Sequence, residues 1–257
     1  MQVTTNEKFV SRRAAIGRWS TIAGFIVLIV GMYVSLQPPQ RSEQFLVPWF
    51  TLIVGIILLN VGKYNSMRWG TNPRVDKALA QALKGFDHRY HLFNYSPSIP
   101  TDHLLVTPFG AVVLETRPFF GDVIHTGSQW RRPMNFNGFF HYFSDGGLGN
   151  PTKEAQRDVE AIQNLLKERL GADDGGKAIV LPIIVMTNPR LKLDVTNPDI
   201  AVVKLADLRG GLRQLKEAPR LPADLQRKLV SALQGEPASP GGQVSSTRSN
   251  TWLRTQK

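Results

Sequence analysis

The sequence predicts a mixed α/β domain preceded by a helical hairpin that spans a membrane. Two apolar segments near the N-terminus, residues 22–34 and 45–61, contain no acidic or basic side chain. After about Arg74 the composition becomes that of a globular domain, in which strand patterns precede and follow a long helical pattern. This order is typical of a sheet covered by helices. A chain of 257 residues has room for one such domain and an additional element.

The two apolar segments predict a transmembrane hairpin over residues 19–64. Each comes close to the roughly 17–25 residues that a membrane-spanning helix needs. Residues 37–44 between them are polar and contain two prolines, as expected of a turn. Two buried helices of a soluble core would carry polar residues at helical spacing, and these segments have almost none.

The basic residues predict the orientation of the hairpin. Four precede the first segment and four follow the second, whereas the turn contains only Arg41. The positive-inside rule therefore predicts a multi-pass protein of the cell (inner) membrane with both termini in the cytoplasm. Residues 1–18 are then a basic cytoplasmic segment, and residues 235–257, rich in serine, glycine and proline, are a disordered basic tail. The flanking cations are Lys8, Arg12, Arg13 and Arg18 before the hairpin and Lys63, Arg68, Arg74 and Lys77 after it.

The overall composition narrows the function classes. Thirty-one lysines and arginines against 20 aspartates and glutamates give a net charge of +11. Such an excess indicates an anionic partner, either nucleic acid or an anionic membrane surface. The absence of cysteine excludes disulfides, cysteine-based zinc sites, iron–sulfur clusters and thiol nucleophiles.

Residues 74–234 are expected to form the α/β domain. Residues 102–107 and 111–116 read as two strands joined at Pro108-Phe109-Gly110, and residues 178–186 form a continuous apolar run typical of a buried strand. Pro151 opens a long helix to about Leu170. Further strands are expected at 88–95, 121–125, 129–132 and 200–205, and further helices at 75–83, 207–215 and 222–233. The aromatic, glycine-rich loop at 135–149 could stack on bases, cover the core or lie at the membrane interface.

Three charged residues of the predicted strand pair could form a site. If Phe109 and Gly110 are the two turn residues, Asp102 faces Arg117 across the strands. Glu115 is then the diagonal neighbour of Asp102, so all three side chains share one face. Two carboxylates at so short a distance can chelate Mg²⁺, and the nearby Arg117 could stabilise charge on a phosphate. A turn longer or shorter by one residue would put Glu115 on the opposite face. The alternative is structural: Asp102 caps the strand entrance and Glu115 pairs with Arg117 or solvent.

The wider pattern resembles a known family. The runs IPTDHLLV (99–106), FGAVVLETR (109–117) and GDVI (121–124), followed by Trp130, resemble the nuclease-related domain (NERD) family. That family resembles the PD-(D/E)XK nucleases, which implies a restriction-endonuclease-like mixed sheet flanked by helices. It further implies that Asp102 and Glu115 bind Mg²⁺, with Mn²⁺ as a substitute, and that Arg117 occupies the place of the lysine that positions or activates water.

The chain departs from the family pattern in three places. Arg117 stays protonated and cannot act as a base, although it can orient phosphate. Asn150-Pro151 resembles the start of the N-P-x-x-Q motif, but Glu154 stands at the glutamine position and Gln156 follows two residues later. Asp76 is a weak counterpart of the acidic residue on the first helix. The predicted site is therefore Asp102, Glu115, Arg117 and Gln156, with Asp102 and Glu115 as metal ligands.

Three functions are compatible with these observations. The first is a membrane-anchored, metal-dependent nuclease relative that hydrolyses or binds cytoplasmic DNA or RNA. The second is a catalytically inactive, membrane-tethered module that contacts nucleic acid, protein or anionic lipid, and arginine at position 117 favours it over strict catalysis. The third is a structural membrane protein whose cations contact only lipid headgroups.

Overall fold

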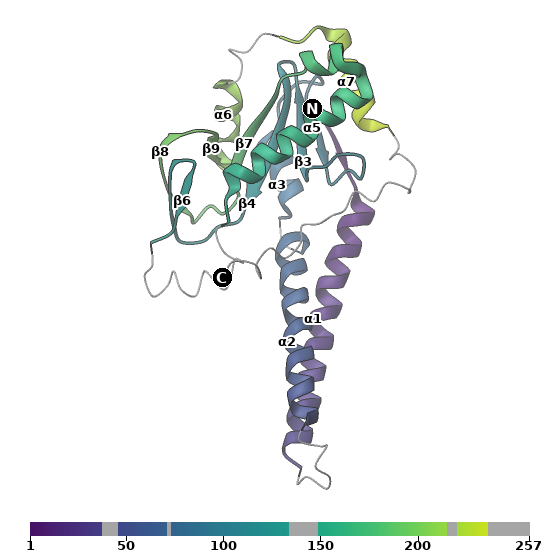
Figure 1. Ribbon diagram of the computed structural model, residues 1–257, viewed down its shortest axis with the longest axis vertical. Helices are drawn as coiled ribbons and strands as arrows, with labels where there is room; N and C mark the ends of the chain where they lie inside the picture. Colours follow the sequence, from purple (N-terminus) through teal and green to yellow (C-terminus); the bar gives the residue numbers. More distant parts are fainter. Residues whose placement is uncertain (38–45, 71–72, 134–148, 215–219, 236–257) are drawn as a thin grey trace.

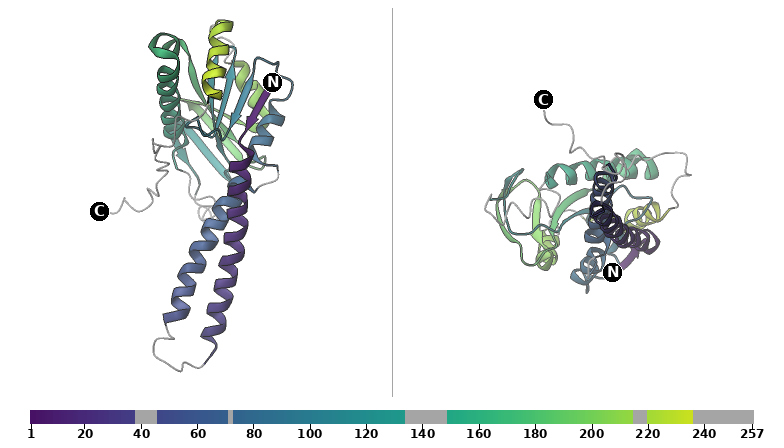
Figure 2. Two further views of the ribbon diagram at one scale, coloured as in Figure 1. Left: turned by 90° about the vertical axis from the view of Figure 1, so that its right-hand side faces the viewer. Right: turned by 90° about the horizontal axis from the view of Figure 1, so that it is seen from below.

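The computed structural model describes residues 1–37, 46–70, 73–133, 149–214 and 220–235. Two long helices, α1 (Glu7–Ser35) and α2 (Leu46–Trp69), lie side by side and project from one end of an α/β part (Figures 1 and 2). The predicted helical hairpin followed by an α/β domain is confirmed. The predicted turn, most of the aromatic loop and nearly all of the predicted tail lie outside the described residues.

Glycines form the contact between the two helices. Gly17, Gly24 and Gly31 of α1 are buried at intervals of seven residues, as are Gly55 and Gly62 of α2. A Cβ atom at Gly31 would overlap Thr51, and one at Gly62 would overlap Thr21. Small residues at this spacing allow two helix backbones to approach closely along one face.

The opposite faces of the hairpin are apolar and exposed. Both helices are long and apolar enough to cross a membrane, and only 17% and 11% of their most apolar stretches are buried. The core helix of a soluble protein would be mostly buried, whereas side chains such as Phe25, Ile29 and Phe50 are more than half exposed. The hairpin is therefore a candidate membrane anchor.

The first residues of the chain contribute a strand to the main sheet. Residues Gln2–Thr5 form strand β1, which pairs in parallel with β2 (His91–Asn94). The Met1 amino group donates to the Phe86 carbonyl at 2.8 Å. The side chain of Asn6 then caps α1 by accepting from the Phe9 N–H at 3.1 Å. Strand β1 was not predicted, because four residues are too few to show an alternating pattern.

The main sheet is mixed and has the strand order β1-β2-β3-β4-β7-β9. Strands β2, β3 and β4 are antiparallel, whereas the β1–β2, β4–β7 and β7–β9 pairs are parallel. A second, three-stranded sheet has the order β6-β5-β8, and β8 was not predicted. The remaining strand bounds are β3 (His103–Thr107), β4 (Gly110–Arg117), β5 (Asp122–Gly127), β6 (Gln129–Arg131), β7 (Val180–Met186), β8 (Lys192–Pro198) and β9 (Ala201–Lys204).

Helices cover both faces of the main sheet. Helices α5 (Pro151–Lys177) and α7 (Ala223–Gln234) bury Ile162, Leu166, Leu229 and Leu233 against one face. Helix α3 (Val75–Ala82) and α6 (Leu208–Gln214), with the short 3-10 helix η2 (Leu205–Asp207), pack on the other face through residues such as Leu79 and Leu212. This confirms the predicted mixed sheet flanked by helices. The predicted end of the long helix at Leu170 coincides with a kink at Gly171, where φ is +83°.

The turn between β3 and β4 differs from the predicted one. Thr107 pairs with Gly110 and Val106 with Ala111, so the two turn residues are Pro108 and Phe109 rather than Phe109 and Gly110. The Thr107 hydroxyl fixes this turn, because it accepts from the Phe109 N–H at 3.1 Å and donates to the Gly110 carbonyl at 2.9 Å. Moving the turn by one residue shifts the cross-strand partner of each residue by two positions. Each side chain therefore stays on its predicted face of the sheet.

Candidate functional site

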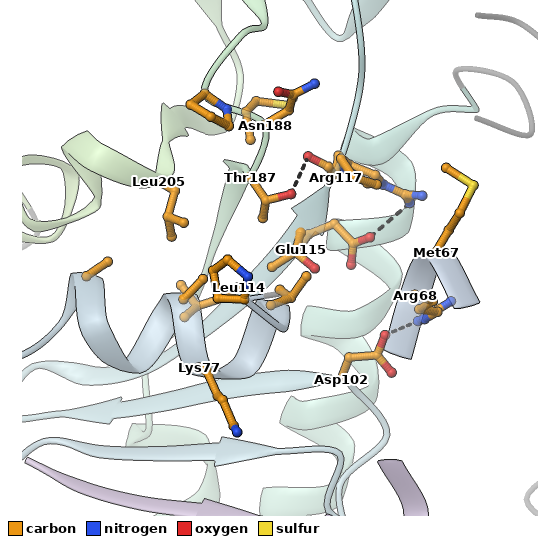
Figure 3. A pocket seen from close by; sticks show the side chains of 18 of the residues that line it. Met67, Arg68, Lys77, Asp102, Leu114, Glu115, Arg117, Thr187, Asn188 and Leu205 are labelled. Carbon is orange, nitrogen blue, oxygen red and sulfur yellow. Dashed lines mark hydrogen bonds and ion pairs between the residues drawn. The ribbon is translucent and has the colours of Figure 1, made fainter. Parts of the chain in front are cut away.

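A cavity of about 1070 Å³ lies where the C-terminal end of α2 meets α3 and the ends of β4 and β7 (Figure 3). Five residues of α2 form one wall, and residues 114–118 with 186–189 form the wall at the edge of the sheet. Apolar side chains such as Met67, Leu114 and Leu205 line much of it. Its charged lining is predominantly cationic and consists of Lys63, Arg68, Lys77, Arg117 and Lys204 against Asp102 and Glu115.

Asp102, Glu115 and Arg117 all line this cavity. The Tyr95 N–H donates to the Asp102 carbonyl at 2.7 Å, which continues the β2–β3 ladder to Asp102. Two residues beyond the Leu104–Val113 pair, the β3–β4 register would bring Asp102 opposite Glu115. The predicted register made them diagonal neighbours, and the observed register, continued to Asp102, would make them direct neighbours across the strands.

Asp102 forms an ion pair with Arg68, the penultimate residue of α2. Arg68 also donates to the Tyr64 hydroxyl at 3.1 Å and lies 5.2 Å from the centre of the Trp69 ring. The sequence marked Arg68 only as one of the cations that flank the hairpin. Its role in the site was not predicted, because nothing in the local pattern indicates a partner 34 residues away. The end of the candidate membrane helix therefore contributes a side chain to the site.

Arg117 lies between two carboxylates. Its guanidinium forms an ion pair with Glu115 at 2.9 Å and a second one with Glu154. Glu154 lies in the first turn of α5, where Asn150 caps the helix by accepting from the Lys153 N–H at 3.1 Å. A carboxylate is favoured in the first turn because the helix dipole is positive there. The Arg117–Glu154 pair thus joins the end of β4 to the start of α5.

The structure does not bring Gln156 to the cavity. Its side chain is exposed on α5 and does not line the cavity, whereas Glu154, two residues earlier, contacts Arg117. Two residues correspond to about 200° around a helix, so these side chains leave on nearly opposite faces. Glu154 was noted only as a substitution for the family's glutamine, and its contact with Arg117 depends on the tertiary fold.

Asp76, the weak counterpart of a family acid, also lies outside the cavity lining. It is buried and accepts from Arg74 at 2.7 and 3.0 Å, and Arg74 also forms an ion pair with Glu7 of α1. The hydrogen bonds that Arg74 donates to Glu7 and Asp76 raise its pKa. These contacts fix the start of α3 against the start of α1.

Two titratable residues beside the site are neutral at pH 7. Burial lowers the pKa of His103 to about 4, and its Nδ1–H donates to Asn94 Oδ1 at 2.8 Å. Burial also raises the pKa of Tyr95, which lines the cavity beside Asp102. Among the described residues that line the cavity there is no histidine.

The donor set of the cavity fits a magnesium ion that keeps water and phosphate oxygens in its coordination shell. Asp102 and Glu115 supply carboxylate oxygens, the ligands that Mg²⁺ prefers, and one or two such residues suffice when a substrate phosphate completes the shell. No third histidine, aspartate or glutamate joins them as a metal-binding group in the described part of the chain. Because each carboxylate contacts an arginine, a metal would compete with Arg68 and Arg117 for them.

Comparison with known protein families gives one match. Residues 71–187 match the family described as NERD, the nuclease-related domain. This segment contains α3 and strands β2 to β7, and it confirms the family resemblance for that part of the chain. No curated protein and no solved structure matches the chain.

Proposed function

We propose that this protein is a membrane-anchored nuclease-related protein that binds a phosphodiester of DNA or RNA in the cavity between α2 and the edge of the sheet. The observation that supports this proposal best is the convergence of Arg68 and Arg117 on the cavity that Asp102 and Glu115 line. The match over residues 71–187 supports the nuclease-related class, and the net charge of +11 suits an anionic partner.

Arg117 is the expected phosphate contact. A guanidinium presents its N–H donors in a planar fork that matches two phosphate oxygens. Glu115 and Glu154 hold this fork at the end of β4, so that it is oriented before the ligand arrives. Asp102 and Glu115 would hold Mg²⁺, or Mn²⁺ in its place, and the bound ion would supply a Lewis acid that neutralises phosphate charge.

Hydrolysis is the second candidate function, and the two carboxylates of the cavity favour it. Metal-dependent cleavage also needs a group that positions or deprotonates water. Arg117 cannot accept a proton, and both carboxylates already contact arginines. Phosphodiester binding therefore agrees better with the described side chains than hydrolysis does.

The proposed placement puts the hairpin in the cell (inner) membrane and both termini in the cytoplasm. Its support is the length and exposure of α1 and α2 together with the basic residues at their shared end. Nucleic acid would then reach the cavity from the cytoplasmic side, close to the membrane surface.

The experiment uses the full chain in nanodiscs of zwitterionic phosphatidylcholine. Binding and cleavage of a fluorescein-labelled 12-nucleotide single strand, as DNA and as RNA, are measured with Mg²⁺, with Mn²⁺ and with EDTA. The proposal expects binding that the metal strengthens and that Asp102→Asn makes insensitive to metal, without cleavage. Metal-dependent cleavage that Asp102→Asn abolishes would establish the second candidate, and absence of binding under all conditions would overturn both.

A further inference from the structure

A strip of residues on α2 connects the cavity with the exposed apolar surface of the hairpin. Four residues of α2 that line the cavity recur at i, i+3, i+4 and i+7, which is the spacing of one helix face. One and two turns earlier the same face carries Ile56 and Ile53, which are 47% and 57% exposed. The α2 strip consists of Ile53, Ile56, Asn60, Lys63, Tyr64 and Met67.

The α2 strip faces away from α1. Gly55 and Gly62 pack against α1, and a Cβ atom at Gly62 would overlap Thr21. Asn60 lies two residues before Gly62, about 200° around the helix. Consequently α1 leaves the strip uncovered, and in a membrane its isoleucines would face the acyl chains.

The polar end of the strip is electropositive. Lys63 is the first charged residue after the apolar part of α2, and Tyr64 beside it is an aromatic residue of the kind that favours the membrane interface. Arg68, one turn further along α2, also lines the cavity. The lining contains five cationic side chains and two carboxylates. Basic pockets at the cytoplasmic end of membrane helices are suited to anionic headgroups.

We propose that the cavity and the α2 strip bind an anionic glycerophospholipid. Its phosphate lies beside Lys63 and Arg68, and one acyl chain follows Ile56 and Ile53 into the bilayer. A nucleic acid has no apolar chain that could cover the two isoleucines, so the apolar part of the strip favours a lipid over a nucleic acid as its ligand. Arg117, on the sheet side of the cavity, remains the contact for nucleic acid, and the lipid proposal rests on the proposed membrane placement of the hairpin.

The test uses the full-length protein in a non-ionic detergent. Equimolar dioleoyl phosphatidylglycerol and dioleoyl phosphatidylcholine are added as mixed micelles, and the lipids retained by the protein are counted by native mass spectrometry. The wild-type protein should retain phosphatidylglycerol in roughly tenfold preference, as expected from one or two cations near the headgroup. Lys63→Gln should reduce this preference about fivefold, and Lys63→Arg should preserve it.

Arg18→Gln is the matched control. Because Gly17 lies against Ser66 and Thr21 against Gly62, Arg18 is level with Asn65, within one helical turn of Lys63, but belongs to the other helix. The control variant should keep the wild-type preference. An equal loss in both variants, or no preference in the wild type, would overturn the proposal, since it would indicate diffuse attraction to the surface or none.

Two further measurements separate the possible sources of failure. A tenfold excess of inorganic phosphate should leave the lipid in place, and full displacement would show a phosphate site without lipid contacts and overturn the proposal. Flotation of the protein with phosphatidylcholine vesicles tests the membrane placement alone, and oligonucleotide binding in phosphatidylcholine nanodiscs tests the proposed function without anionic lipid. A protein that floats and binds oligonucleotide but lacks lipid preference would overturn only the lipid proposal.

Discussion

Arg68 at the end of α2 and Asp102 before β3 form an ion pair across the boundary between the helical hairpin and the α/β part. Arg68 is held in place by Tyr64 and Trp69 of its own helix. Asp102 is in turn fixed through its carbonyl by the Tyr95 N–H. The position of the candidate membrane helix therefore decides which cation Asp102 contacts, and the anchor and the site are parts of one assembly.

Removal of Arg68 should strengthen metal binding at Asp102. In Arg68→Gln the carboxylate loses its cationic competitor, so we expect Mn²⁺ to bind about tenfold more tightly, as the loss of a partly buried ion pair suggests. Electron paramagnetic resonance of free Mn²⁺ measures this affinity directly. Arg89→Gln is the control, because Arg89 pairs with Asp87 on the surface and lies outside the cavity lining. Weaker Mn²⁺ binding in Arg68→Gln would instead show that Arg68 holds Asp102 in its binding position.

Arg117→Lys should preserve oligonucleotide binding within a few-fold and should not create cleavage. A lysine at this position keeps the positive charge, and Glu115 and Glu154 beside it would hold it protonated. A gel assay with Mg²⁺ and the labelled single strand checks both statements. If cleavage appears in this variant, the site has lost only the lysine of the family pattern, and hydrolysis becomes the better account.

His103 should make the protein less stable in acid. Burial lowers its pKa to about 4, whereas an unfolded histidine titrates near 6.5. Between these values the unfolded state binds a proton that the native state does not, so the free energy of unfolding falls as the pH decreases from 6.5 towards 4. The total loss is about 3 kcal/mol. Thermal unfolding in detergent at pH 7 and pH 5 should show a smaller decrease in Tm for His103→Gln, and equal decreases would contradict this assignment.

Gly62→Val should separate the two long helices. A Cβ atom at this position overlaps Thr21, and the contact involves backbone atoms that cannot move aside. We expect a large loss of monodisperse protein and a lower Tm, as overpacking of a close contact predicts. Val61→Leu is the neighbouring control, because Val61 is 40% exposed and lies outside the glycine contact. Equal behaviour of the two variants would exclude the glycine contact.

Much of the fold could be predicted because long patterns determine it. The apolar helices, the strand at 180–186 and the helix that Pro151 opens each carry a signal of seven or more residues. Strand β1 carries only four residues, and β8 alternates charged and apolar side chains over only its first four residues, so neither was recognised. Asp102, Glu115 and Arg117 were singled out from the predicted strand pair and from the family motifs, and all three line one cavity.

The remaining site residues depend on contacts between distant segments. Arg68 and Glu154 reach the site only after α2 and α5 pack against the sheet, and the sequence around each is ordinary for a helix end. The turn was misplaced by one residue because Pro108-Phe109 and Phe109-Gly110 are both acceptable turn pairs. The hydroxyl of Thr107 decides between them through its two hydrogen bonds.

The salt dependence of oligonucleotide binding tests the central claim most directly, namely that the cavity binds a phosphate of nucleic acid. The dissociation constant of the labelled single strand is measured from 50 to 300 mM NaCl for the full-length protein in phosphatidylcholine nanodiscs. Arg117→Gln should weaken binding about tenfold and reduce the slope of log K against log salt by roughly 0.7, the loss of one phosphate contact on a single strand. Arg89→Gln, with the same change in charge, should alter neither quantity. Equal effects of the two variants would show that binding follows overall charge and would contradict a phosphate site in the cavity.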